Sequence, residues 1–310
     1  MASAARTRIA PPLLDWSEDH RTEFARGVVS ARHQLARLPL FTDEALAALL
    51  DRHDRANLDV CTMGRDPAGR ASWRDVPVCR HLPGHHLMEA VHQTRLWVHA
   101  RHALDTDSAL KPVFAAMMEQ LRHLNPGWAP LRAYGGVVIA SPGAQVFLHS
   151  DISETMMFQV RGAQQVFVYP PRDPWVSDRA LEGVLLGEAG EDLPYDPSWD
   201  AQAARIEMER GSFAAWPLHA PHRISFGNEL SVTLVLEVVT QESLLKNGVL
   251  HANGLMRRAG LNPKSTGTGG LGAAVKLAIS RAAKTASAIR KRRAEPEIPD
   301  ITLAGALEQV

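Results

Sequence analysis

The stretch QVFLHSDISETMMFQVRGAQQVFVYPP, residues 145–171, decides the fold. Apolar residues dominate both halves around Arg161-Gly162, which predicts two strands joined by a tight turn. His149 and Asp151 stand two residues apart on the first strand, and side chains at that spacing share one face. An imidazole and a carboxylate therefore converge on a strand that is otherwise apolar, which indicates a binding role for the pair.

The pair supplies two ligands for a divalent transition metal, and one further histidine would complete a two-histidine, one-carboxylate set. The spacing alone is common in surface pairs, so the third ligand matters. Residues 211–227, GSFAAWPLHAPHRISFG, offer His219 and His222. We favour His222, which stands at the entry of an alternating strand. His219 lies in a turn between two prolines and is expected to face outward or to hydrogen-bond the loop.

The remaining chain predicts a mainly β protein. Short strands follow one another from residue 129 onward, and ELSVTLVLEVVT, residues 229–240, is the most strongly β-branched run. Such spacing favours a closed or sandwiched antiparallel core with helices packed outside. Helices are expected at residues 19–38, 42–55 and 107–126, and a basic helix at 273–293.

Composition narrows the class of protein. The 310 residues are 45% hydrophobic and 22% charged, with 34 basic and 34 acidic side chains, so no nucleic-acid or membrane attraction is expected. The two cysteines, Cys61 and Cys79, do not suggest a disulfide scaffold. The first residues lack the apolar core of a signal peptide, and no run is long enough for a membrane helix. We expect a cytoplasmic protein.

Several motifs together resemble one family: HSD, FQVRG and VFVYPPRD in the hairpin, LPYDPSW, GSFAAWPLHAPHRISFGNELSVTLVLE, and LHANGLMRRAGLNP. They look like those of the bacterial cupin-like, jumonji-C-related proteins, relatives of the asparaginyl hydroxylase that acts on a hypoxia factor. The resemblance spans at least residues 94–265. It implies a double-stranded β-helix (jelly-roll) core, Fe(II), 2-oxoglutarate as cosubstrate and hydroxylation as the reaction. It also makes His149, Asp151 and His222 the iron ligands.

We expect three parts: an N-terminal helical and extended region (1–93), a jelly-roll catalytic domain (94–245) and a C-terminal helical region and tail (246–310). The substrate, a small molecule or a protein side chain, is not identified by the sequence. Residues 50–95 and the insertion at 172–204 are expected to shape the pocket mouth. The terminal helices are compatible with a homodimer.

The cosubstrate positions depart from the family pattern. Gln164 stands where the family carries a lysine for the distal carboxylate of 2-oxoglutarate, Val146 where it often has threonine, and Thr155 where it has asparagine. A glutamine donates a hydrogen bond but does not neutralise a carboxylate. Compensating groups are sought in one set of residues: Arg132, Arg161, Arg223, Ser231 and Thr233. Two alternatives stay open: a binding or sensor protein on the same fold, and a metal-dependent cupin enzyme that does not use 2-oxoglutarate.

Overall fold

Two facing antiparallel sheets form the centre of the protein. Within residues 13–66 and 72–291, which the computed structural model describes, the sheets have nine and four strands. Eight consecutive strands make the barrel: β6 (Pro130–Ala140), β7 (Gln145–His149), β8 (Glu154–Arg161), β9 (Gln164–Val168), β10 (Ala204–Met208), β11 (Ser212–Ala215), β12 (His222–Phe226) and β13 (Ser231–Thr240). The order β11-β8-β13-β6 faces the order β10-β9-β12-β7. This is the expected jelly roll.

The long β-branched run forms β13, which pairs with β6 on one side and β8 on the other. Alternate residues of β13 point to opposite sides of the sheet, and both sides are covered by other parts of the protein. Val235 faces the barrel interior, whereas Leu234 and Leu236 pack into the core on the outer face. A strand buried on both faces needs apolar residues at nearly every position, which explains the composition of this run.

Five further strands extend the larger sheet: β1 (Leu14–Asp15), β2 (Val29–His33), β3 (Leu58–Thr62), β4 (Arg74–Asp75) and β5 (Leu96–Ala100). The helix expected over residues 19–38 is therefore wrong beyond α1 (Glu18–Glu23). Residues 29–33 alternate buried and exposed, and they pair with β11. Sheet pairing overrides the helical spacing because it buries Val29 and Ala31 against the core.

Helices cover the outer face of the larger sheet and one end of the barrel. The N-terminal ones are α2 (Asp43–Arg52), α3 (Gly84–Gln93), α4 (Ala103–Thr106) and α5 (Lys111–Leu124), with short 3-10 turns η1 (Leu35–Arg37), η2 (Pro39–Phe41), η3 (Arg55–Asn57) and η5 (Pro77–His81). Thr42 caps α2, its side chain accepting from the Ala45 amide. Asp107 caps a turn before α5, accepting from the Ala109 and Leu110 amides.

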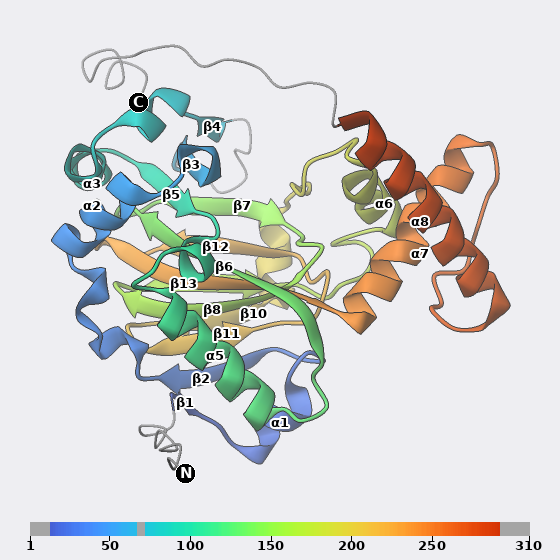
Figure 1. Cartoon of the computed structure of the whole chain (residues 1–310), viewed down its shortest axis with the longest axis horizontal. Helices are drawn as coiled ribbons and strands as arrows, with labels where there is room; N and C mark the ends of the chain where they lie inside the picture. The colour runs from blue at the N-terminus through green and yellow to red at the C-terminus, as the bar shows by residue number, and fades with distance from the viewer. Residues whose placement is uncertain (1–12, 67–71, 292–310) are drawn as a thin grey trace, which may run out of the picture.

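The C-terminal helices gather on the opposite side from α2 and α3 (Figure 1). They are α6 (Asp178–Leu186), α7 (Gln241–Arg258) and α8 (Gly270–Lys291), and the 3-10 turn η6 (Pro197–Gln202) precedes β10. α7 packs against both α6 and α8. Among the described helices, none is both long and apolar enough to cross a membrane. Cys61 and Cys79 are buried free thiols.

Candidate metal centre

Three side chains converge at one end of the barrel. His149 ends β7, His222 begins β12, and the two residues pair directly across these neighbouring strands. The sequence pattern predicts Asp151 on the first strand, but the residue lies in the loop between β7 and β8. The His149 Nε2 lies 3.7 Å from Asp151 Oδ1, and the His222 Nε2 lies 3.6 Å from Asp151 Oδ2. One donor atom from each residue lies within 4.8 Å of the other two. The structure thus brings together the three residues that the sequence singled out.

Hydrogen bonds fix which ring nitrogen is free on each histidine. The Nδ1 of His149 lies 2.9 Å from the Phe147 carbonyl, and the Nδ1 of His222 lies 3.1 Å from the Ala220 carbonyl. Each Nδ1 must carry the proton to donate to a carbonyl, so each Nε2 keeps a lone pair aimed at Asp151. This tautomer is the one that binds a metal through Nε2.

Asp151 is oriented by a neighbouring hydroxyl. The Thr155 Oγ1 donates to Asp151 Oδ2 at 2.5 Å. Burial alone would raise the pKa of Asp151, but the charges of His222 and His149 and the Thr155 hydrogen bond hold it below its usual range. Burial lowers the pKa of His222 to about 4. At neutral pH the set therefore offers a neutral imidazole and an ionised carboxylate, the forms that metals require.

His219 does not join this set. It adopts a left-handed conformation with φ of 66° in the turn before β12. Its Nε2 lies 2.7 Å from the Asn247 Oδ1 on α7, and its carbonyl accepts from the Ser150 hydroxyl at 2.9 Å. The preference for His222 over His219 agrees with this geometry: His219 ties the turn to α7, and His222 faces the barrel.

A cavity of about 360 Å³ opens from the three residues. Its mouth is marked by the exposed and half-buried lining residues, which are carboxylates, aromatic rings and one arginine: Asp59, Asp75, Glu191, Glu237, Trp73, Trp97, Phe147 and Arg80. Its deep part is lined by buried apolar residues: Val138, Val146, Met157, Ile224, Phe226 and Val235. His99 and Cys61 complete the described lining together with Thr155.

Glu191 and Glu237 were missed by the sequence reasoning. Part of each side chain is exposed to solvent at the mouth. The surrounding protein still removes water from both carboxyls, and together with the nearby Asp151 charge this raises their pKa, that of Glu191 to about 8. The lone acidic residue in the apolar run of β13 was a signal for Glu237. Nothing local marks Glu191, because only the tertiary fold brings it to the site.

Glu191 arrives on the segment 187–203, which we call the strap. The strap runs along β7: the Ser150 amide donates to the Glu191 carbonyl at 3.0 Å, and the Leu193 amide donates to the Leu148 carbonyl at 2.8 Å. The expectation that residues 50–95 and 172–204 shape the mouth agrees with this lining.

The residues expected to hold a cosubstrate fall into separate places. Thr155 lines the cavity beside Asp151. Gln164, Ser231 and Thr233 are buried, but they lie outside the cavity lining. The Thr233 hydroxyl lies 2.8 Å from Gln159 Oε1 and 3.3 Å from Gln164 Oε1, and the Gln159 amide donates to the Ser231 hydroxyl at 2.7 Å. These side chains close the barrel interior with neutral groups.

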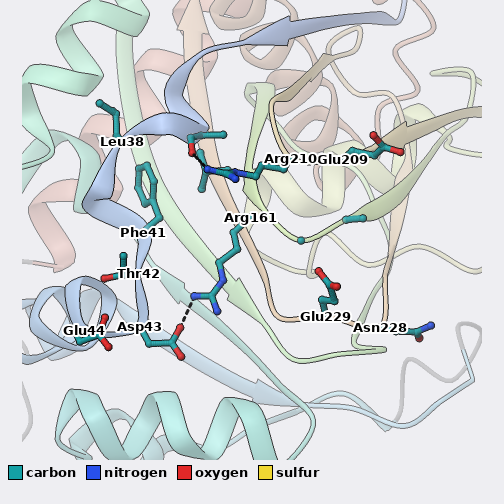
Figure 2. Close-up of a pocket in the computed structure, with 14 residues that line it drawn as sticks. Leu38, Phe41, Thr42, Asp43, Glu44, Arg161, Glu209, Arg210, Asn228 and Glu229 are labelled. Carbon is teal, nitrogen blue, oxygen red and sulfur yellow. Dashed lines mark hydrogen bonds and ion pairs between the residues drawn. The ribbon is translucent and has the colours of Figure 1, made fainter.

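The three arginines considered as replacements for the lysine also lie elsewhere. Arg161 forms an ion pair with Asp43 in a wider hollow of about 880 Å³ at the other end of β8 (Figure 2). Arg223 stacks over the Phe167 ring at 3.5 Å and pairs with Asp200. Arg132 is exposed on β6. None of the three lines the described cavity.

No family model matches the chain, and no curated protein matches it. Among solved structures, the X-ray structure of Escherichia coli YcfD aligns with a TM-score of 0.50 at 16% identity, covering 96% of this chain and 66% of that chain. The chain shares the fold of YcfD. A structure of Escherichia coli YcfD described as a ribosomal oxygenase, in complex with cobalt and 2-oxoglutarate, aligns with a TM-score of 0.45 at 15% identity, covering 91% of this chain and 60% of that chain. This chain therefore spans less than two thirds of the length of YcfD.

The donor set fits a divalent metal such as Fe(II). Two imidazole nitrogens and one carboxylate oxygen lie within 4.8 Å of one another, and a hydrogen bond orients each side chain. The lining does not fit the second carboxylate of 2-oxoglutarate in the same way. At the deep end the described lining is apolar. Gln164, at the position where the resembled family has lysine, is buried and does not line the cavity.

Proposed function

We propose that this protein is an Fe(II)-dependent oxygenase that consumes a 2-oxo acid and oxidises an organic substrate at the mouth of the barrel. The observation that carries the proposal is the His149, Asp151 and His222 set, which opens directly onto a cavity inside a jelly roll. Three protein ligands leave further metal positions for exogenous molecules.

The residues have separable roles in this proposal. His149 and His222 bind the metal through Nε2, held by their Nδ1 hydrogen bonds to Phe147 and Ala220 carbonyls. Thr155 orients Asp151. The bound iron supplies oxygen activation. The apolar lining deeper in the barrel excludes bulk water from the reacting groups.

The side chains at the mouth favour a substrate with a positively charged group. Glu191 and Glu237 line it, and neither forms an ion pair among the residues that the structure describes. A cation placed beside them would favour the ionised form of each carboxyl, whose pKa is otherwise raised by burial and by the Asp151 charge. Trp73 and Trp97, whose ring centroids lie 5.4 Å apart, add faces that attract cations. We include a protein side chain among the substrates, which is consistent with the description of YcfD as a ribosomal oxygenase.

A second candidate function, a metal-binding sensor without turnover, is favoured by one observation. Gln164 replaces the expected cation, and no other described cation takes its place at the deep end of the cavity. The two candidates share the metal and differ in oxygen consumption.

The test measures metal binding first. Anaerobic protein is titrated calorimetrically with Fe(II) and with Mn(II) as a redox-stable substitute, and we expect one site per chain. His222→Ala should abolish binding at that site, whereas His219→Ala, the matched histidine outside the set, should retain it. Circular dichroism confirms folding of both variants. Absence of binding by the wild type, or equal binding by His222→Ala, would contradict the proposal.

Oxygen uptake by the iron-loaded protein with 2-oxo acids then separates oxygenase from sensor. Uptake that depends on both iron and a 2-oxo acid supports the enzyme. Stoichiometric iron binding without uptake favours the sensor.

A further inference from the structure

The deep part of the cavity differs from its mouth in chemistry. We propose that it accepts a 2-oxo acid with an uncharged, apolar tail, and that it discriminates against 2-oxoglutarate and other dicarboxylic 2-oxo acids. This inference rests on the proposed function, and it concerns which cosubstrate the same site takes.

Strand register places the lining in successive layers. His149 and His222 pair at the metal layer, where Thr155 and Glu237 also pair. One layer deeper, roughly 7 Å along the strands, Val146 pairs with Ile224 and Met157 pairs with Val235. All four side chains line the cavity. A cosubstrate chelated at the metal with its tail pointing into the barrel therefore meets a collar of four apolar side chains.

The next layer closes the cavity without supplying charge. Phe226 lines the end, and its strand partner Gln164 lies behind the lining. The Gln164 oxygen accepts from Thr233, and its amide nitrogen donates to two thioethers, 3.5 Å from the Met208 Sδ and 3.8 Å from the Met157 Sδ. A glutamine held in this way presents no positive charge to a tail in the collar.

No compensating cation approaches from elsewhere in the described part of the chain. Of the described residues lining the cavity, Arg80 is the one with a permanent positive charge, and it stands at the mouth. It lies 2.6 Å from Asp75 and 4.0 Å from Asp59, so its charge is already engaged by carboxylates. Arg223 lies on the strand next to His222, but it stacks on the Phe167 ring and pairs with Asp200 outside the cavity.

Desolvation then decides between tails. A carboxylate moved from water into an apolar collar loses hydration and finds no cation in return, whereas an alkyl tail gains from leaving water. The reaction itself places no demand on the tail. The 2-oxo acid, O₂ and R–H give CO₂, an acid shorter by one carbon and R–OH, with one oxygen atom of O₂ in each of the last two products.

The experiment compares two acids of matched shape. Full-length, iron-loaded, anaerobic protein is titrated with 2-oxoglutarate and with 5-methyl-2-oxohexanoate, in which an isopropyl group replaces the distal carboxylate. The visible charge-transfer band of the iron chelate reports the Kd of each acid without turnover. We expect the apolar acid to bind roughly 100-fold more tightly, on the scale of leaving a buried charge without its partner.

The outcomes separate this inference from the proposed function. Equal or tighter binding of 2-oxoglutarate, or no band with either acid on iron-loaded protein, overturns the inference and leaves the metal site standing. Failure to bind iron overturns both. The Gln164→Lys variant provides a second test. A lysine at this layer adds a cation, which should shift the ratio of the two Kd values toward 2-oxoglutarate. An unchanged ratio in a folded variant would argue against the inference.

Discussion

The hydrogen bond from Thr155 to Asp151 should control metal affinity. Thr155→Val keeps the shape of the side chain and removes only the hydroxyl. Thr155 is 5% exposed, so water does not readily replace the lost donor. The carboxylate of Asp151 would then keep its charge while losing the group that fixes its Oδ2 at 2.5 Å.

Two independent scales give a similar magnitude. A hydrogen bond to a charged group contributes about 1.5–3 kcal/mol. Loss of a hydrogen bond that orients a metal ligand typically costs about 10–100-fold in metal affinity, which equals about 1.4–2.8 kcal/mol. We therefore expect the Kd for Mn(II) or Fe(II) to rise by about 10–100-fold in Thr155→Val.

Calorimetric titration under anaerobic conditions measures this Kd. Thr155→Ser is the matched control, because it keeps the hydroxyl and should stay within a few-fold of the wild type. An affinity for Thr155→Val equal to that of the wild type would refute the argument that this hydroxyl orients Asp151. A parallel loss in Thr155→Ser would instead point to packing.

Two further predictions concern stability. Gly162 and Gly143 both have a positive φ, 68° and 65°, but their surroundings differ. A Cβ added at Gly162, in the β8–β9 turn, would lie 2.5 Å from the Leu230 carbonyl oxygen, whereas a Cβ at Gly143 would meet open space. Thermal unfolding should therefore show a loss of more than about 1 kcal/mol for Gly162→Ala and a smaller loss for Gly143→Ala, and equal losses would show that the contact is unimportant. Burial alone would raise the pKa of Asp200, but hydrogen bonds from Arg223, Tyr169 and Tyr195 hold it below its usual range. The ionised carboxylate therefore stabilises the folded protein fully above about pH 4, and this contribution is lost as the pH falls through the folded-state pKa. Urea unfolding should show Asp200→Asn to be less stable by about 1 kcal/mol at pH 7, with the difference shrinking as the pH falls below about 4. A constant difference would exclude the ionised carboxylate as the cause.

Local patterns were sufficient for much of the barrel. The apolar strand that ends at His149, the turn at Gly162 and the β-branched run of β13 each depend on neighbours in the chain, so the sequence predicts them directly. Local reasoning failed at residues 29–33, whose strand conformation depends on β11, a partner about 180 residues away. Helical spacing in a short segment yields to such pairing when it buries apolar side chains.

The sequence by itself indicated two candidate metal ligands two residues apart and a short choice of histidines for the third, because both are matters of residue identity and local spacing. The absence of the usual lysine followed from the family resemblance, which places Gln164 at that position. Only the tertiary structure decided that His222 faces Asp151 while His219 turns to Asn247, and that Glu191 reaches the mouth on the strap. It also decided that Arg161 and Arg223 turn away from the cavity. The direction and surroundings of a long side chain depend on which strands become neighbours, and that is a property of the whole fold.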